Sequence, residues 1–284
     1  MSNKFDDLGN AEIFSTWCFN LEYKEIPNEV IDKIKLIFMD SLGLIFASRN
    51  EDYIKAIKQS FTDSGNCTVP GHLEKLCPSD AIVLNGTAIH GEDFDDTFEG
   101  TPVHVGSVMC SSLLTAAEYY KLKPKEILKG LAVGSELMCR LALVSPMAIH
   151  KQGFHPTAIL GAFGASIGIS KILKNSVLQT TSSLGIVGSM ASGIIEYLAE
   201  GAWTKRLHPG WAGASGWKSA HLGKNNFKGP RTVFEGKNGI FNSFADSKII
   251  PDFKKLTDDL GSHWHTNNLA IKPFACGTMT QPFI

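Results

Sequence analysis

The densest group of ionisable side chains lies between His90 and Glu99, in the sequence His-Gly-Glu-Asp-Phe-Asp-Asp-Thr-Phe-Glu. Five carboxylates within eight residues repel one another unless another group uses their charge. On a helix, His90, Asp93 and Thr97 would share one face. Two interpretations remain open at this point: a solvated helix end and a functional site.

Metal binding is a third interpretation of the same cluster. Asp95, Asp96 and Glu99 form the DDxxE pattern with which helical terpene synthases hold magnesium. No second Asn/Ser/Glu metal motif follows it. The six cysteines contain no CxxC pair, which disfavours structural zinc and an iron–sulfur cluster. We therefore expect no metal and no cofactor.

Two histidines precede helix-like segments. His104 stands just before Ser107, which we expect to cap the next helix, and His155 stands before Pro156, which suits a first helical turn. A single histidine in such a place is often a hydrogen-bonded structural residue. Two histidines at helix N-termini are well placed to act on an anion.

Cationic side chains gather in one further segment. Lys205, Arg206 and His208 lie within four residues, beside Gly and Trp, and such a group suits carboxylates. Lys272 stands among apolar residues instead. Its ammonium is either at the surface on a buried stem or directed into a site, and the sequence leaves both open.

Helices must position these residues, because the apolar residues recur with helical periodicity and alternating strand-like runs are nearly absent. We predict a mainly α-helical fold with small residues, such as Gly134 and Gly164, at close helix contacts. After Leu198 the periodicity weakens, which predicts a loop-rich stretch until Asp246. The expected helices cover residues 28–45, 79–89, 107–120, 124–144, 156–173 and 178–198.

Composition excludes several function classes. The 27 Lys and Arg residues nearly balance 28 Asp and Glu residues, so no global field favours nucleic acid or anionic lipid. The uncharged segment 152–170 is too short for a membrane span and is better explained as a buried helix. Scattered cysteines fit a reducing compartment, so we expect a cytoplasmic protein.

Taken in chain order, six motifs resemble the MmgE/PrpD family, whose members include 2-methylcitrate dehydratases, cis-aconitate decarboxylases and iminodisuccinate epimerases. The resemblance spans the chain. The motifs are Asn85-Gly-Thr-Ala-Ile-His90, Asp93-Phe-Asp-Asp-Thr97, His104-Val-Gly-Ser107, Gly153-Phe-His155-Pro-Thr157-Ala, Lys205-Arg-Leu-His208-Pro-Gly-Trp-Ala and Ile271-Lys272-Pro-Phe-Ala-Cys276.

The resemblance implies a large helical domain, a smaller α+β lid, an active site between them and a homodimer. Residues 1–268 correspond to the helical domain. Residues 269–284 correspond to the start of a lid that is truncated in this chain, because family members continue beyond the Lys-Pro-Phe motif. By motif position, the family's catalytic residues correspond to Asp93, Thr97, His104, His155, Lys205 and Lys272, and we add Arg206 and His208 as substrate-binding residues.

The implied reaction is a cofactor-independent lyase reaction on a small polycarboxylate. We rank a 2-methylcitrate dehydratase-like hydro-lyase first, followed by an epimerase and a decarboxylase. The sequence after Lys272 departs from the histidine-bearing sequence of the decarboxylases. A truncated helical protein that only binds an anion or dimerises is the remaining alternative.

Overall fold

The computed structural model describes residues 8–284, and most of them are helical. This confirms the predicted mainly α fold. The longer helices are α1 (Asn10–Asn20), α2 (Asn28–Ser48), α3 (Asp52–Ser60), α4 (Pro78–His90), α5 (Val105–Tyr120), α6 (Pro124–Val144), α8 (Pro156–Ile172), α9 (Val177–Gly188) and α11 (Thr204–Lys224). The short helices are α7 (Ala148–Lys151), α10 (Tyr197–Glu200), α12 (Ile240–Ser243) and α13 (Lys254–Thr257), with 3-10 turns at Tyr23–Glu25, His265–Asn268 and Thr278–Phe283.

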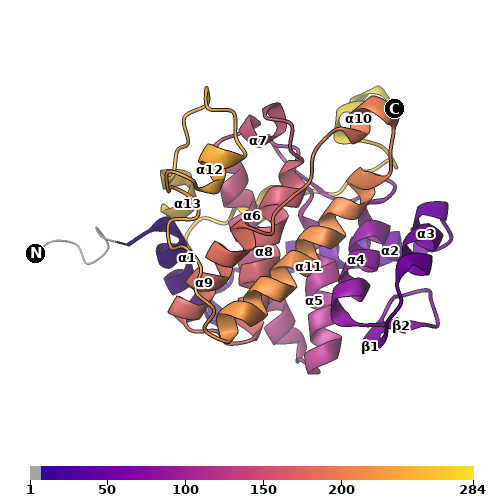
Figure 1. Ribbon diagram of the computed structural model, residues 1–284, viewed down its shortest axis with the longest axis horizontal. Helices are drawn as coiled ribbons and strands as arrows, with labels where there is room; N and C mark the ends of the chain where they lie inside the picture. The colour runs from indigo at the N-terminus through magenta and orange to yellow at the C-terminus, as the bar shows by residue number, and fades with distance from the viewer. Residues whose placement is uncertain (1–7) are drawn as a thin grey trace, which may run out of the picture.

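Helix α8 forms the centre of the core. All of its residues except Lys171 are buried, because it consists of apolar and small side chains on every face. It packs chiefly against α11 and α6, and also against α5 and α9 (Figure 1). The uncharged segment is thus a buried core helix, as predicted, and among residues 8–284 no helix combines the length and apolar character needed to cross a membrane.

Glycines allow these helices to touch backbone to backbone. A Cβ atom placed on Gly134 of α6 would lie 2.5 Å from the carbonyl oxygen of Gly164 in α8. A Cβ atom on Gly86 of α4 would lie 2.5 Å from the Cα atom of Gly210 in α11. Neither position has room for a larger residue, so the expected close-packing role of the small residues is confirmed.

The prediction of a loop-rich stretch after Leu198 was wrong over the residues of α11. The expected helix over 178–198 ends early, at Gly188, and α11 then runs for 21 residues with Pro209 inside it. Gly and Pro suggested a loop because they disfavour isolated helices, but in α11 the glycines are the contact surface against α4, α8 and α9. The expected return of regular structure over 246–260 yields only α13.

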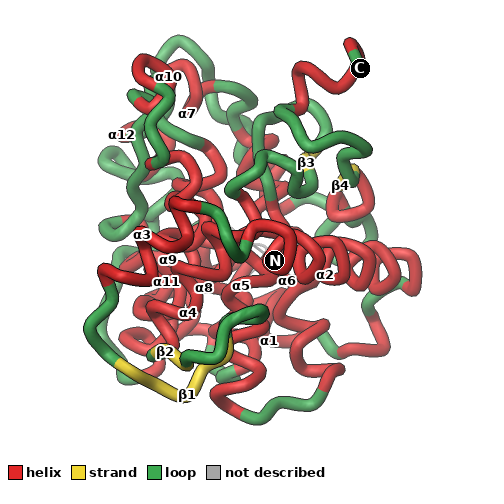
Figure 2. Tube along the Cα trace, turned by 90° about the vertical axis from the view of Figure 1, so that its right-hand side faces the viewer, coloured by secondary structure: helices red, strands yellow, loops and turns green. Residues whose placement is uncertain are grey.

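Two small antiparallel sheets lie at opposite ends of the molecule (Figure 2). Strand β1 (Ser64–Thr68) pairs with β2 (Lys75–Leu76), with an irregular register. Strand β3 (Thr97–Phe98) pairs with β4 (Leu269–Ala270), so that Thr97 faces Ala270 and Phe98 faces Leu269. The second pairing brings the C-terminal segment beside the acidic cluster.

Candidate active site

The acidic cluster forms a turn rather than a helix. Helix α4 ends at His90, and Thr97 already belongs to β3, so the shared helical face of His90, Asp93 and Thr97 is not formed. Asp93 has a left-handed backbone, with φ 51°. The solvated-end interpretation is wrong, because Asp95 is fully buried. The turn folds Asp95 and Asp96 inward, where other groups bind them, whereas Glu92 and Glu99 remain exposed.

Asp96 holds the start of α5. Its Oδ2 accepts the N–H of Val105 at 3.1 Å and its Oδ1 accepts the N–H of Gly106 at 2.7 Å. The helix begins at Val105, so Ser107 is not the cap that the sequence predicted. The N–H groups at a helix start lack intrahelical partners, and a carboxylate satisfies two of them here. Burial and the nearby Asp95 raise the pKa of Asp96 to about 7.

The magnesium interpretation is also wrong. Asp96 uses both oxygens on backbone N–H groups, and Glu99 is exposed. Asp95 instead accepts the Nδ1–H of His90 at 2.9 Å. The three carboxylates of the pattern therefore do not converge as ligands of one ion.

Four histidines form a buried cluster. His104 and His155 occupy the positions just before α5 and α8, as predicted. Their ring centroids are 6.5 Å apart, and the ring of His90 lies 5.0 Å from His104 and 5.6 Å from His155. Nδ1 of His155 is 3.1 Å from Nδ1 of His208 on α11. Three separate helix ends and one helix face thus bring four imidazoles together.

Two lysines converge on Asp93. Nζ of Lys205 lies 2.7 Å from Asp93 Oδ2, and Nζ of Lys272 lies 3.1 Å from Asp93 Oδ1 and 2.7 Å from the Asp93 carbonyl oxygen. The ammonium of Lys272 is also 4.0 Å from Asp95 Oδ1. Lys272 is buried, which excludes the surface alternative left open by the sequence. The β3–β4 pairing places it there, two residues after β4.

Arg206 contacts the acidic turn, and Thr97 lies in β3. Nε of Arg206 donates to the carbonyl of Gly91 at 2.7 Å, and its guanidinium lies over the ring of Tyr53 at 4.5 Å. It therefore steadies the acidic turn. Thr97 is buried in β3, opposite Ala270. These contacts leave the catalytic role of Thr97 and the substrate-binding role of Arg206 as predictions.

Burial sets the charge state of the histidines. Burial, opposed in part by Asp95, lowers the pKa of His104 to about 4. Burial, the neighbouring imidazoles and Lys205 lower the pKa of His208 to about 4 and hold that of His155 well below its usual range. These three imidazoles are therefore neutral near pH 7.

The two carboxylates Asp93 and Asp95, unlike the histidines, keep their charge at neutral pH. Burial alone would raise the pKa of Asp93, but Lys205 and Lys272 more than offset it and lower the pKa. Burial would likewise raise the pKa of Asp95, but its neighbours His90, His104 and Lys272 hold it well below the usual range. Both carboxylates are ionised at neutral pH.

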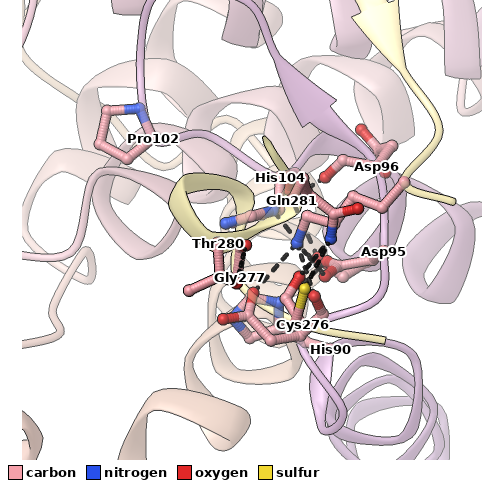
Figure 3. Close-up of polar contacts among 12 residues, drawn as sticks. His90, Asp95, Asp96, Pro102, His104, Cys276, Gly277, Thr280 and Gln281 are labelled. Carbon is pink, nitrogen blue, oxygen red and sulfur yellow. Dashed lines mark hydrogen bonds and ion pairs between the residues drawn. The ribbon is translucent and has the colours of Figure 1, made fainter. Parts of the chain in front are cut away.

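Sequence reasoning missed His90, Asp95 and Asp96 as members of the site. Figure 3 shows His90 and His104 around Asp95, with Asp96 beside them. The signal was present, because His90 ends the first of the six motifs and both carboxylates lie in the second.

A metal ion would have three possible ligands in this cluster. His90, Asp95 and His104 each offer one ligand atom, and these atoms lie within 4.8 Å of one another. The surroundings do not fit an ion, because the buried ammonium of Lys272 already lies 4.0 Å from Asp95 Oδ1. A divalent cation there would face that ammonium without water to screen it. Moreover, Nδ1 of His104 is 2.8 Å from the carbonyl oxygen of Asp96.

A groove of about 660 Å³ borders the histidine cluster. His208 and Tyr197 line it on the cluster side, and Leu207 and Trp211 add apolar surface. On the lysine side, a methyl group added to Gly277 would lie 3.3 Å from Asp93 Oδ2, so the segment after Lys272 passes close to the site. Figure 3 draws this segment with the buried carboxylates. Of the histidines and lysines of the site, only His208 lines the groove, and Glu196 and Glu200 line it as well.

Comparisons with known proteins agree on one family. Residues 12–251 match the sequence profile of the MmgE/PrpD N-terminal domain. A cis-aconitate decarboxylase-like protein of Aspergillus oryzae is 29% identical over 276 residues, covering 92% of this chain and 57% of that protein. The cis-aconitate decarboxylase of Aspergillus terreus is 26% identical over 274 residues, covering 92% and 56%. The human cis-aconitate decarboxylase is 28% identical over 280 residues, covering 89% and 57%. The chain thus spans a little over half the length of these relatives.

Proposed function

The chain belongs to the MmgE/PrpD family, and on that premise we propose that its site serves a lyase acting on a small polycarboxylate. One observation carries the proposal: Lys205 and Lys272 converge on a single carboxylate, Asp93, beside a cluster of neutral histidines. Two ammonium groups that share one carboxylate are arranged to bind a second one.

Substrate binding would use the cations that Asp93 now holds. A carboxylate of the substrate would take the place of, or add to, the Asp93 carboxylate on Lys205 and Lys272. The buried position of Lys272 strengthens that contact, since little water screens it. Arg206 would act through the turn at Gly91, and His208 from the wall of the groove.

Proton transfer would fall to the histidines. Loss of a proton, or of carbon dioxide, at a carbon next to a carboxylate leaves negative charge that Lys205 and Lys272 can stabilise. His104 and His155 are neutral near pH 7, so either can accept a proton from such a carbon. In a dehydration, Thr97 could pass a proton to the departing hydroxyl group.

Two lyase reactions fit this arrangement. Dehydration of a 2-methylcitrate-like tricarboxylate ranks first because dehydratases are frequent in the family, and the departure after Lys272 argues against decarboxylation rather than for dehydration. Decarboxylation of a cis-aconitate-like tricarboxylate is the second candidate, because the relatives compared above carry that name. In the decarboxylation, the bond to the carboxylate breaks, carbon dioxide leaves, and the remaining electron pair takes up a proton that comes from water.

Incubation with candidate substrates tests the proposal. The 284-residue protein is mixed separately with 2-methylcitrate, cis-aconitate and iminodisuccinate, and products are followed by proton NMR, while thermal unfolding reports binding. Turnover of either tricarboxylate supports the lyase, and turnover of iminodisuccinate alone would replace it with an epimerase. Stabilisation without turnover would favour the anion-binding alternative. Absence of both would contradict the proposed site.

A further inference from the structure

His90 is the one histidine of the cluster that is held by a carboxylate at hydrogen-bonding distance. Its Nδ1 lies 2.9 Å from Asp95 Oδ2, and both side chains are fully buried. Asp95 is ionised and has no hydrogen to donate, so Nδ1 must carry the proton of this bond. Asp95 therefore fixes the tautomer of His90, and Nε2 is the nitrogen at which a proton can be gained or lost.

Nε2 of His90 has no hydrogen-bonding partner among residues 8–284 and is buried. A buried polar atom without a partner costs about 1–3 kcal/mol, so such atoms call for an explanation. The ring lies against His104 and stacks on His155, the two imidazoles proposed to take a proton from the substrate. The unpartnered nitrogen thus belongs to the ring that contacts both of them.

We propose that His90 is the proton-relay residue of this site and that Asp95 is its positioning residue. After His104 or His155 has taken a proton from the substrate, that imidazole bears two N–H groups. It turns one of them toward Nε2 of His90 and transfers the proton. His90 then becomes an imidazolium beside the Asp95 carboxylate, and the proton returns by the same path.

The environment explains why a relay is useful. His104, His155 and His208 resist protonation because they are buried and crowd one another. His90 has a buried carboxylate 2.9 Å away to balance a positive charge, whereas Asp95 Oδ1 lies 3.8 Å from His104. Asp95 Oδ1 has no hydrogen-bonding partner among the described residues, so it retains capacity to stabilise a cation.

A first experiment reads the tautomer and needs no turnover. Long-range proton–nitrogen correlation NMR on the protein labelled with 15N-histidine, at pH 7, should show His90 with a protonated Nδ1 and a bare Nε2. The signals are assigned by their loss in His90→Asn. The opposite tautomer, or an imidazolium in the resting protein, would overturn the proposal, because neither leaves an acceptor at Nε2. A shift on adding zinc that EDTA reverses would replace the relay with a metal site.

A second experiment uses kinetics and rests on the proposed function. In His90→Asn the amide nitrogen can still donate to Asp95, but nothing stands in place of Nε2. We expect kcat to fall about 100-fold, a typical contribution of proton transfer, with KM changed by less than about threefold. Asp95→Asn should lower kcat similarly, whereas His150→Asn, outside the cluster, should change nothing.

The outcomes separate the two proposals. Unchanged kcat in His90→Asn would overturn the relay, and so would a loss that parallels a fall in the unfolding temperature. If the wild-type protein turns over none of the substrates, the proposed lyase fails, and the NMR experiment still decides whether His90 has the relay geometry.

Discussion

Replacing Asp93 by Asn should destabilise the protein and increase the stabilising effect of a tricarboxylate. The carboxylate of Asp93 pairs with Lys272, whose side chain is 1% exposed, and with Lys205, whose side chain is 27% exposed. Breaking a buried pair by removing one partner costs about 3–5 kcal/mol, whereas an exposed pair contributes at most about 1 kcal/mol. Since Asp93 is itself 30% exposed, we take the lower end, about 3 kcal/mol.

The assay is thermal unfolding with and without citrate. For a chain of 284 residues, 3 kcal/mol corresponds to a fall of about 5 °C in Tm, because the unfolding entropy is about 2.1 cal/mol/K per residue. Citrate should raise the Tm of Asp93→Asn by more degrees than it raises the Tm of wild type. In the variant, the carboxylates of citrate no longer compete with Asp93 for the two ammonium groups. Asp32→Asn removes a mostly exposed pair with Lys35 and serves as the control, with less than about 1 °C expected.

Two results would refute this reasoning. An Asp93→Asn variant as stable as wild type would mean that Lys272 does not depend on this carboxylate. An equal gain from citrate in both proteins would mean that the anion binds elsewhere.

Three further predictions address the same site. Because the pKa of His104 is about 4 in the folded protein and about 6.5 when unfolded, the unfolded state binds more protons between those values; stability therefore falls as the pH drops from 6.5 to 4, by about 3 kcal/mol for this group. His104→Asn should remove this part of the pH dependence in chemical denaturation, and an unchanged slope would contradict the neutral state of His104. Dialysis against EDTA should change neither unfolding temperature nor any turnover, and restoration of a lost activity by magnesium or zinc would show that the metal-free assignment is wrong. Lys205→Ala should reduce turnover far more than stability, because its ion pair is partly exposed; equal losses would indicate a structural lysine.

The sequence could predict which residues gather at the site better than how they are held. His104 and His155 stand at helix starts because Pro156 and the apolar runs that follow mark those starts in the sequence. Asp96 could not be assigned as the cap of α5, since that contact joins residues nine and ten positions apart through a turn. The buried position of Lys272 also could not be predicted from the sequence alone, because the pairing of β3 with β4 places it there.

Helix α11 was the largest part of the fold that local reasoning missed. Gly210, Gly213 and Gly216 weaken an isolated helix, but in the folded protein each meets a neighbouring helix too closely for a Cβ atom. The stability that this packing adds comes from contacts between helices. The periodicity of the sequence does not reveal such contacts. Several predictions stay untested, among them the roles of the site residues, the boundary between residues 268 and 269, the homodimer and the cytoplasmic location.

A crystal structure of the protein with citrate bound would show whether Lys205 and Lys272 bind the carboxylate of a ligand. We expect one citrate carboxylate within about 3 Å of Nζ of both Lys205 and Lys272, with the Asp93 carboxylate moved from at least one of them and the histidine cluster within reach of the same ligand. Citrate bound at another surface, with Asp93 still bridging both lysines, would contradict this expectation.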